Sequence, residues 1–191
     1  MELIDLKKVK DGRYLKNYEL TYLNKVGNEK TYEIVSRKEL QSPADLGKQP
    51  SGLSIVATRG NQLLLLNEFR MGINKRIYNL CAGMLEEGES VEECVRRELY
   101  EETGYGHGQW SHFMTISPNP GSCNNYSHTF LAVGVEPVSC QHLEQTEDIS
   151  FSLWEPEQVK DLLLQDGFSQ ALMVAPLWKY FYQIDLHSHL P

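Results

Sequence analysis

Residues 91–103 carry carboxylates at spacings that could do chemistry on one face of a helix. On a helical wheel at 100° per residue, Glu98 and Glu102 fall within the apolar stripe and Glu101 lies at its rim. The stripe itself is expected to consist of Val91, Cys94, Val95 and Leu99, and the side facing away of Glu92, Arg96, Tyr100 and Thr103.

Carboxylates within an apolar stripe need a positive partner. An unpaired buried carboxylate is costly, and carboxylates one turn apart repel each other. Arg97 can neutralise at most one of them. All-oxygen ligands favour Mg²⁺, with Mn²⁺ as an alternative. The wheel also fits an acidic, solvent-exposed helix edge, so the helix pattern alone leaves both interpretations open.

The helix belongs to a longer pattern that runs from Gly83 to Tyr105. Written G-x5-E-x7-R-E-U-x-E-E-x-G-U, with U apolar, the pattern resembles the Nudix box of the Nudix hydrolases. All seven fixed positions match, and Leu99 and Tyr105 fill the two apolar positions. A match of this length is far more specific than a lone glycine pattern.

The resemblance implies roles for individual residues. Glu98 and Glu102 would be the principal Mg²⁺ ligands, and the backbone carbonyl of Ala82 would be another. Glu101 would be a further ligand or a bridge to a second metal ion. Arg97 would orient the glutamates by a charged hydrogen bond. Glu89 would help to hold the loop that precedes the helix.

The expected chemistry is hydrolysis of a phosphoanhydride. Metal ions neutralise the diphosphate and lower the pKa of a bound water, and a carboxylate takes the proton. The family fold is an α/β/α sandwich around a mixed sheet. We therefore expect an α/β protein with that sandwich and a small N-terminal antiparallel β domain.

Features outside the box resemble the ADP-ribose pyrophosphatase branch of the family. Arg70, at a strand end, would bind phosphate, and Met84 would line the site. Tyr32 and Arg37 match an aromatic-Glu-x-x-x-Arg strand whose aromatic residue stacks on adenine in that branch. Glu147 matches a late glutamate of the branch. The resemblance implies a small-molecule nucleotide substrate, AMP and a sugar phosphate as products, and a homodimer.

Departures from the branch keep alternatives open. Asn79-Leu80-Cys81 replaces the usual apolar entry to the box, and residues 122–126 contain no acidic residue. Gln145 stands where the branch often has a base, so the base is Glu144 or Glu147. Other sugar nucleotides, coenzyme A-like compounds and nucleoside triphosphates remain possible substrates. A non-enzymatic ADP-ribose sensor is the remaining alternative.

The elements that must position these residues follow from hydrophobic periodicity and turn residues. Strands are expected at 17–24, 31–37, 53–58, 62–69, 78–81, 110–116, 127–135 and 148–154, and helices at 91–103, 156–165 and 169–186 with a kink at Pro176. The unbroken run Leu63–Leu66 predicts a strand that is buried on both faces. His112 and His128 lie in expected strands, where packing explains them without a ligand role.

Composition limits the classes of partner. A net charge of −8 and a pI of about 5.3 argue against nucleic-acid binding. The four cysteines form no CxxC pair, and the chain has neither a signal peptide nor a long apolar run, so we expect no membrane partner and a cytoplasmic protein. The expected domains are residues 1–48, for dimerisation and substrate contact, and the catalytic residues 49–191.

Overall fold

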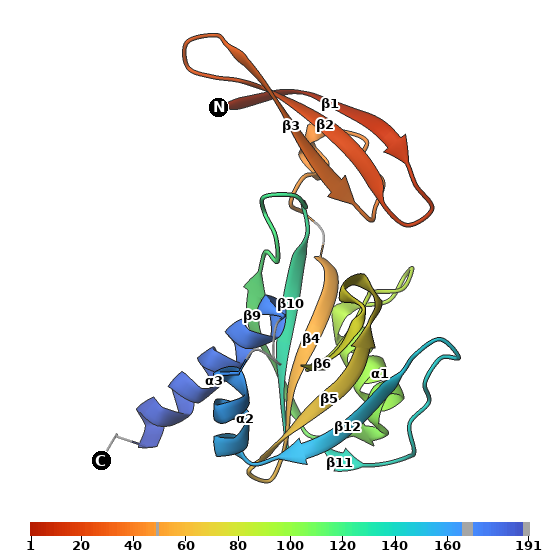
Figure 1. The fold of residues 1–191 in the computed structure, drawn as a ribbon, viewed down its shortest axis with the longest axis vertical. Helices are drawn as coiled ribbons and strands as arrows, with labels where there is room; N and C mark the ends of the chain where they lie inside the picture. Colours follow the sequence, from red (N-terminus) through yellow and green to blue (C-terminus); the bar gives the residue numbers. More distant parts are fainter. Residues whose placement is uncertain (49, 166–169, 189–191) are drawn as a thin grey trace. The chain divides into compact units, whose positions relative to one another are not determined.

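The computed structural model describes residues 1–48, 50–165 and 170–188, which form two compact units (Figure 1). The N-terminal unit comprises Met1–Ser51 together with Ile116–Ser127. The second unit comprises Gly52–Thr115 and the chain from His128 onward. The hairpin segment Ile116–Ser127 is thus distant in sequence from the N-terminal residues with which it packs.

The N-terminal unit is a three-stranded antiparallel sheet in the order β1-β2-β3. Its strands are β1 (Glu2–Asp11), β2 (Lys16–Leu23) and β3 (Glu29–Ser36), followed by a 3₁₀ turn at Pro43–Asp45. The hairpin expected from the sequence is β2–β3. The sequence did not indicate β1, because its many charged residues obscure the alternation of apolar side chains.

A small core and the hairpin segment hold this unit together. Tyr18, Leu20, Ile34 and Leu40 form the buried cluster, and the Tyr18 hydroxyl accepts a hydrogen bond from the Leu40 N–H at 2.8 Å. β3 contacts the segment 116–127 through backbone and side chain. The Val35 N–H donates to Ser122 O at 2.8 Å, and the Tyr32 hydroxyl donates to Gly121 O at 2.6 Å.

The second unit is built on a seven-stranded sheet whose main path runs β12-β5-β4-β10-β9. β6 pairs with β5, and β7 pairs with β4. The strands are β4 (Pro50–Arg59), β5 (Gln62–Arg70), β6 (Lys75–Asn79), β7 (Cys81–Gly83), β9 (Gln109–Ile116), β10 (Tyr126–Val133) and β12 (Ile149–Trp154). A second 3₁₀ turn, Met71–Ile73, links β5 to β6, and β8 (Tyr105–Gly106) pairs with β11 (Glu136–Pro137).

The sheet is mixed because one central pair is parallel. Ser54 of β4 bonds Thr129 of β10 through their hydroxyls at 2.9 Å. Further along, Thr58 O accepts hydrogen bonds from Gly134 and Val135 just beyond β10. Both strands therefore advance in the same direction, whereas β5 pairs antiparallel with β4 and β12.

Helices cover both faces of this sheet, as Figure 1 shows. Leu64 and Leu66 of β5 pack with α1 (Val91–Thr103), and Leu63 and Leu65 pack with α2 (Pro156–Leu163) and α3 (Ala171–Ser188). All four leucines are at most 1% exposed, which confirms the prediction of a strand buried on both faces. The architecture is the expected α/β/α sandwich.

Local chemistry fixes both ends of α1. The Ser90 hydroxyl accepts a hydrogen bond from the Glu93 N–H, and the Glu93 carboxylate accepts one from the Ser90 N–H, which completes a capping box. The helix ends at Gly104, whose φ of 71° is left-handed. A Cβ at Gly104 would also overlap Ser139 O, so both backbone conformation and close packing require glycine.

One helix-face prediction was wrong. Thr103 was expected to face away from the core, but it is 1% exposed. Its hydroxyl donates to Leu99 O at 2.5 Å and accepts a hydrogen bond from the Tyr105 N–H at 3.1 Å. The chain that follows α1 returns and packs at Gly104, next to Thr103, and a wheel cannot anticipate that contact.

Smaller differences concern element ends. The strand expected at 78–81 is divided between β6, which pairs with β5, and β7, which pairs with β4. Between them the Asn79 side chain accepts a hydrogen bond from the Leu80 N–H at 3.0 Å. The expected start of the last helix at residue 169 and the domain boundary at residue 49 lie outside the described residues.

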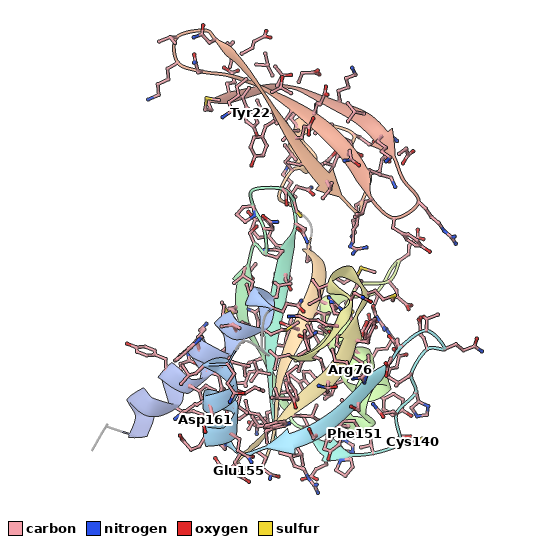
Figure 2. The ribbon with its side chains drawn as sticks, in the orientation of Figure 1. Tyr22, Arg76, Cys140, Phe151, Glu155 and Asp161 are labelled. Atoms are coloured by element: carbon pink, nitrogen blue, oxygen red, sulfur yellow. The ribbon has the colours of Figure 1, made fainter. Side chains whose placement is uncertain are left out.

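A bidentate ion pair joins the start of β12 to β6. Arg76 of β6 donates to both carboxylate oxygens of Asp148, the residue before β12, at 2.6 and 3.0 Å (Arg76 is labelled in Figure 2). Among the described helices, none combines the length and apolar character needed to cross a bilayer.

Candidate active site

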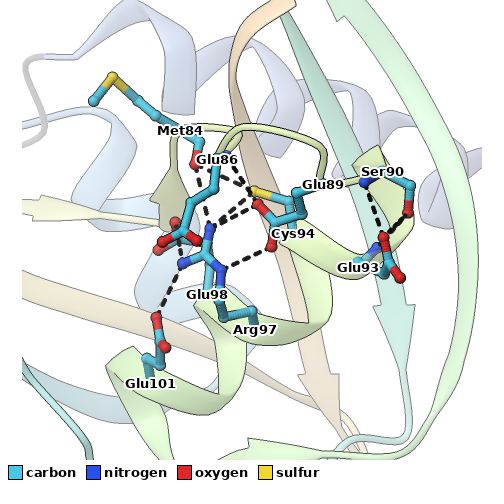
Figure 3. A network of polar contacts seen from close by, with 9 residues as sticks. All are labelled: Met84, Glu86, Glu89, Ser90, Glu93, Cys94, Arg97, Glu98 and Glu101. Carbon is cyan, nitrogen blue, oxygen red and sulfur yellow. Dashed lines mark hydrogen bonds and ion pairs between the residues drawn. The ribbon is translucent and has the colours of Figure 1, made fainter.

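Arg97 is the centre of a dense polar network on α1 (Figure 3). Its guanidinium binds both oxygens of Glu89, through Nε at 2.8 Å and Nη2 at 3.0 Å. Nη1 donates to Glu98 and Glu101, each at 3.0 Å. Nη2 also reaches Met84 O at 3.3 Å. One planar, five-donor side chain thus orients three glutamates at once, as only arginine can.

Glu102 lies deeper, between α1 and β7. Its carboxylate accepts a hydrogen bond from the Ala82 N–H at 3.0 Å, and Glu102 as a whole is only 5% exposed. The Ala82 N–H therefore points away from β4, its ladder partner. Because the N–H and C=O of one strand residue point to the same side, the Ala82 carbonyl also faces the Glu102 side of β7.

The site concentrates negative charge in a buried place. Burial raises the pKa of Glu102 to about 9, partly opposed by the Ala82 N–H, and the charges of Glu98, Glu68 and Glu147 raise it further. Burial also raises the pKa of Glu98, against the lowering effect of Arg97. Conversely, Arg97 lowers the pKa of Glu89 to about 2. Glu89 is thus the stable counter-ion of Arg97, whereas the charged forms of Glu98 and Glu102 are disfavoured because the protein supplies too little positive charge beside them.

Glu68 is a site residue that the sequence argument did not single out. It is 8% exposed at the end of β5, hydrogen-bonds the Asn79 amide, and lies 3.4 Å from Nη1 of Arg70. Its charge acts on Glu102. The available signal was a carboxylate two residues after the apolar run of β5. Arg70, in turn, keeps about half of its side chain exposed.

Gly83 explains the first fixed position of the box. A Cβ added there would overlap the carboxylate of Glu98. A side chain at residue 83 would therefore force the Glu98 carboxylate out of the position that it holds beside β7. Met84 follows with an exposed side chain, while its carbonyl is one of the acceptors of Arg97.

The chain after β11 closes over the end of α1 and carries the late glutamate. The His142 N–H donates to Glu101 O at 2.8 Å, and the Gln141 amide donates to Glu102 O at 2.6 Å. Further along, the Glu147 carboxylate accepts the Glu144 N–H at 2.8 Å. Glu147 is exposed, and its charge raises the pKa of both Glu98 and Glu102, so it lies within electrostatic reach of them.

Two of the sequence candidates belong to the N-terminal unit. Tyr32 is 37% exposed and is held by its bond to Gly121 O. Arg37 is exposed and lines a cleft of about 510 Å³ within this unit. Lys48 and Asn124 line the same cleft. A volume of this size is in the usual range for small-molecule sites.

The box residues fit a divalent cation by their chemistry. Glu98, Glu102 and the Ala82 carbonyl offer only oxygen, which hard cations prefer. Within the described ranges, no three His, Cys, Asp or Glu side chains already surround one point. The reason is visible in Figure 3, where Arg97 draws Glu98 and Glu101 to itself. The raised pKa values of Glu98 and Glu102 show that a further positive charge would stabilise this group.

The fold and these carboxylates agree with a comparison to known families. Residues 48–174 match the model of the NUDIX domain, so this chain belongs to the Nudix family. Members of that family generally need a divalent metal ion. Among solved structures, the chain resembles a crystal structure of an ADP compounds hydrolase, with a TM-score of 0.80 and 20% sequence identity. The match covers 98% of this chain and 96% of the other. That likeness establishes the fold.

Two curated relatives show moderate sequence similarity. The chain is 32% identical over 92 residues to an ADP-ribose pyrophosphatase of Bacillus subtilis strain 168, covering 48% of this chain and 50% of the relative. It is 30% identical over 95 residues to a methanol dehydrogenase activator of Bacillus methanolicus, covering 49% and 51%. The matches thus span about half the length of these relatives.

Proposed function

We propose that this protein hydrolyses the pyrophosphate of a nucleoside diphosphate derivative, with ADP-ribose or an ADP-sugar as substrate. The observation that carries the proposal is the cluster of the Glu98, Glu102 and Glu147 carboxyl groups beside Arg97, whose guanidinium is held by Glu89. The reaction adds water across the phosphoanhydride. One phosphorus gains the hydroxyl, the bridging oxygen leaves with the other phosphate, and the products are AMP and a sugar phosphate.

In this proposal Mg²⁺ is the divalent ion, with Mn²⁺ able to replace it. Glu98, Glu102 and the Ala82 carbonyl would hold it, and Glu101 would be a further ligand released from Arg97. When bound, the ion neutralises the diphosphate and acidifies water. The support is the oxygen-only donor set and the burial of Glu102.

The protein's own residues would do the remaining work. Glu147 is the proposed base, because its charge acts on both buried glutamates, whereas Glu144 contributes its backbone N–H to hold Glu147. The half-exposed Arg70 would bind a phosphate, since Glu68 fixes its position while leaving donors available. Met84 would line the same place with its exposed side chain.

The choice of substrate rests on the relatives and on the N-terminal unit. One relative is an ADP-ribose pyrophosphatase. Tyr32 offers an exposed ring for stacking on a base, and Arg37 offers a cation in a cleft of suitable volume. We also propose a cytoplasmic homodimer, whose mass light scattering would measure.

The test is a substrate panel of ADP-ribose, ADP-glucose, GDP-mannose, NADH, coenzyme A and dATP, with Mg²⁺ or with EDTA. Chromatography identifies the nucleotide products. We expect AMP from ADP-ribose or ADP-glucose, and loss of turnover with EDTA and in Glu102→Gln. Glu92→Gln, an exposed glutamate of the same helix, is the matched control and should keep full activity.

The panel also separates the alternatives. Turnover confined to GDP-mannose, coenzyme A or dATP would retain the chemistry and reject the adenosine diphosphate substrate. Tight ADP-ribose binding without any turnover would reject the enzyme and favour a sensor. Glu147→Gln and Glu144→Gln distinguish the base, because only loss of the base should lower kcat by about 10²–10⁴-fold without changing metal affinity.

A further inference from the structure

Two histidines that are 16 residues apart meet on the β9–β10 hairpin of the second unit (the strands are labelled in Figure 1). His112 Nε2 and His128 Nδ1 lie 3.3 Å apart. The Thr115 hydroxyl lies 3.0 Å from the first nitrogen and 2.8 Å from the second. Both imidazoles therefore direct a ring nitrogen toward one common point.

We propose that His112 and His128 form a chelating site for a transition-metal ion of the Zn²⁺ class, separate from the carboxylates of the Nudix box. The two ligand atoms would be Nε2 of His112 and Nδ1 of His128. Solvent would fill the remaining positions. Neutral imidazole is the commonest protein ligand for such ions, whereas Mg²⁺ prefers oxygen.

The nitrogen separation discriminates between coordination geometries. Two ligands at about 2.0–2.1 Å from a tetrahedral ion lie about 3.3–3.4 Å apart, whereas at right angles they lie about 2.9 Å apart. The observed 3.3 Å fits the tetrahedral case without a shift of either strand. Only the Thr115 side chain has to rotate, and that residue is exposed.

The surroundings suit a bound cation that comes from solvent. His112 is exposed and its ring lies edge-on to Phe130 with centroids 5.6 Å apart, whereas His128 is half-buried. The first turn of α1 places Glu92 close enough for its charge to act on His128. Burial and the electrostatic effect of His112 lower the pKa of His128, which favours its neutral form. The neutral His128 ring can therefore offer a lone pair to a cation.

The ion would also tie two strands together at a defined place. Thr115 and His128 lie at the points where the chain leaves the second unit and returns to it, on either side of the segment 116–127. An ion held by both strands would stabilise the base of that hairpin, because it binds the folded arrangement in preference to the unfolded chain. This gives the proposal a readout that does not depend on catalysis.

The test titrates Zn²⁺ into the chain of residues 1–191 in excess Mg²⁺, which occupies oxygen sites, and follows binding by calorimetry. Co²⁺ serves as a second probe, since four-coordinate Co²⁺ absorbs visible light far more strongly than octahedral, oxygen-bound Co²⁺. We expect one Zn²⁺ per chain, a strong Co²⁺ band, and a rise in Tm with Zn²⁺. His112→Ala and His128→Ala should each weaken Zn²⁺ binding by more than about tenfold, since even outer-sphere changes cost 10–100-fold.

Matched variants make the result decisive. His142→Ala removes a histidine of the same unit outside the pair, and a double change of His187 and His189 to Ala removes the two near the chain end; both should bind Zn²⁺ as the wild type does. Thr115→Val removes the shared hydroxyl but keeps both nitrogens, so it should retain binding. The proposal is wrong if His112→Ala and His128→Ala, shown to be folded by circular dichroism, keep wild-type affinity. It is equally wrong if His142→Ala or Thr115→Val loses binding to the same extent.

Discussion

Replacing Arg97 with Gln should destabilise the protein more than any other single change on the exposed side of α1. The guanidinium binds Glu89 with two hydrogen bonds and binds Glu98 and Glu101 with one each. The Glu89 and Glu98 side chains are only 12% and 13% exposed. Glutamine cannot supply the charge, so these carboxylates would remain buried without a counter-ion.

The magnitude follows from that burial. Removing one partner of a buried ion pair costs about 3–5 kcal/mol. The Arg97 side chain is 24% exposed, so solvent reduces the penalty, and we expect the lower end, about 3 kcal/mol. For a chain of this size, that loss lowers Tm by roughly 6–12 °C. Arg97→Lys should recover part of the loss, because an ammonium restores charge without the planar fork.

The pH dependence provides an internal check. Arg97 lowers the pKa of Glu89 from an ordinary 4.5 to about 2. The stabilisation from this pair is therefore fully present above about pH 4.5 and is lost as the pH falls through about 2. The stability difference between wild type and Arg97→Gln should be constant near neutral pH and should shrink in that acidic window.

The assay is urea unfolding and thermal melting in EDTA, with Arg96→Gln as the neighbouring control. Arg96 lies over the Trp110 ring at 4.9 Å and is exposed, so its loss should cost below about 1 kcal/mol. If Arg97→Gln costs no more than Arg96→Gln, or if its deficit does not change in acid, then Arg97 does not act as the counter-ion of this group.

Three further changes test other parts of the structure. Gly83→Ala should displace the Glu98 carboxylate, whose end can move, so kcat/KM should fall by about 10²-fold while Tm changes little; wild-type kinetics would contradict the close approach. In EDTA, stability should fall as pH rises from about 4.5 to about 9, with a slope of up to about 1.4 kcal/mol per pH unit, because the folded protein holds the Glu102 proton more tightly than the unfolded chain does. Glu102→Gln should remove that slope, which thermal melts of both proteins at several pH values would measure. An unchanged slope in the variant would mean that the burial of Glu102 is not its cause. Tyr18→Phe should leave the buried Leu40 N–H without its acceptor and cost about 1–3 kcal/mol by denaturant unfolding, and a neutral result would mean that the hydrogen bond contributes nothing.

The sequence alone determined the family fold and the identity of the box. The spacing of Glu98 and Glu102 placed both carboxylates within the apolar stripe of a helix, and the helix expected at 91–103 is confirmed as α1. The unbroken leucines of β5 predicted a strand covered on two faces. These features are local, since helix period, capping and strand burial are encoded within about ten to fifteen neighbouring residues.

Only the tertiary structure decided which distant residues meet. Glu68 lies 34 residues before Glu102 in the sequence, yet its charge acts on that carboxylate. His112 and His128 converge because β9 and β10 are neighbours in the sheet, and the segment 116–127 joins the N-terminal unit through Val35 and Tyr32. Thr103 is buried because a later segment covers it. Such contacts depend on strand order and chain crossings, for which a single sequence carries no local signal, whereas capping and periodicity are set by neighbours along the chain.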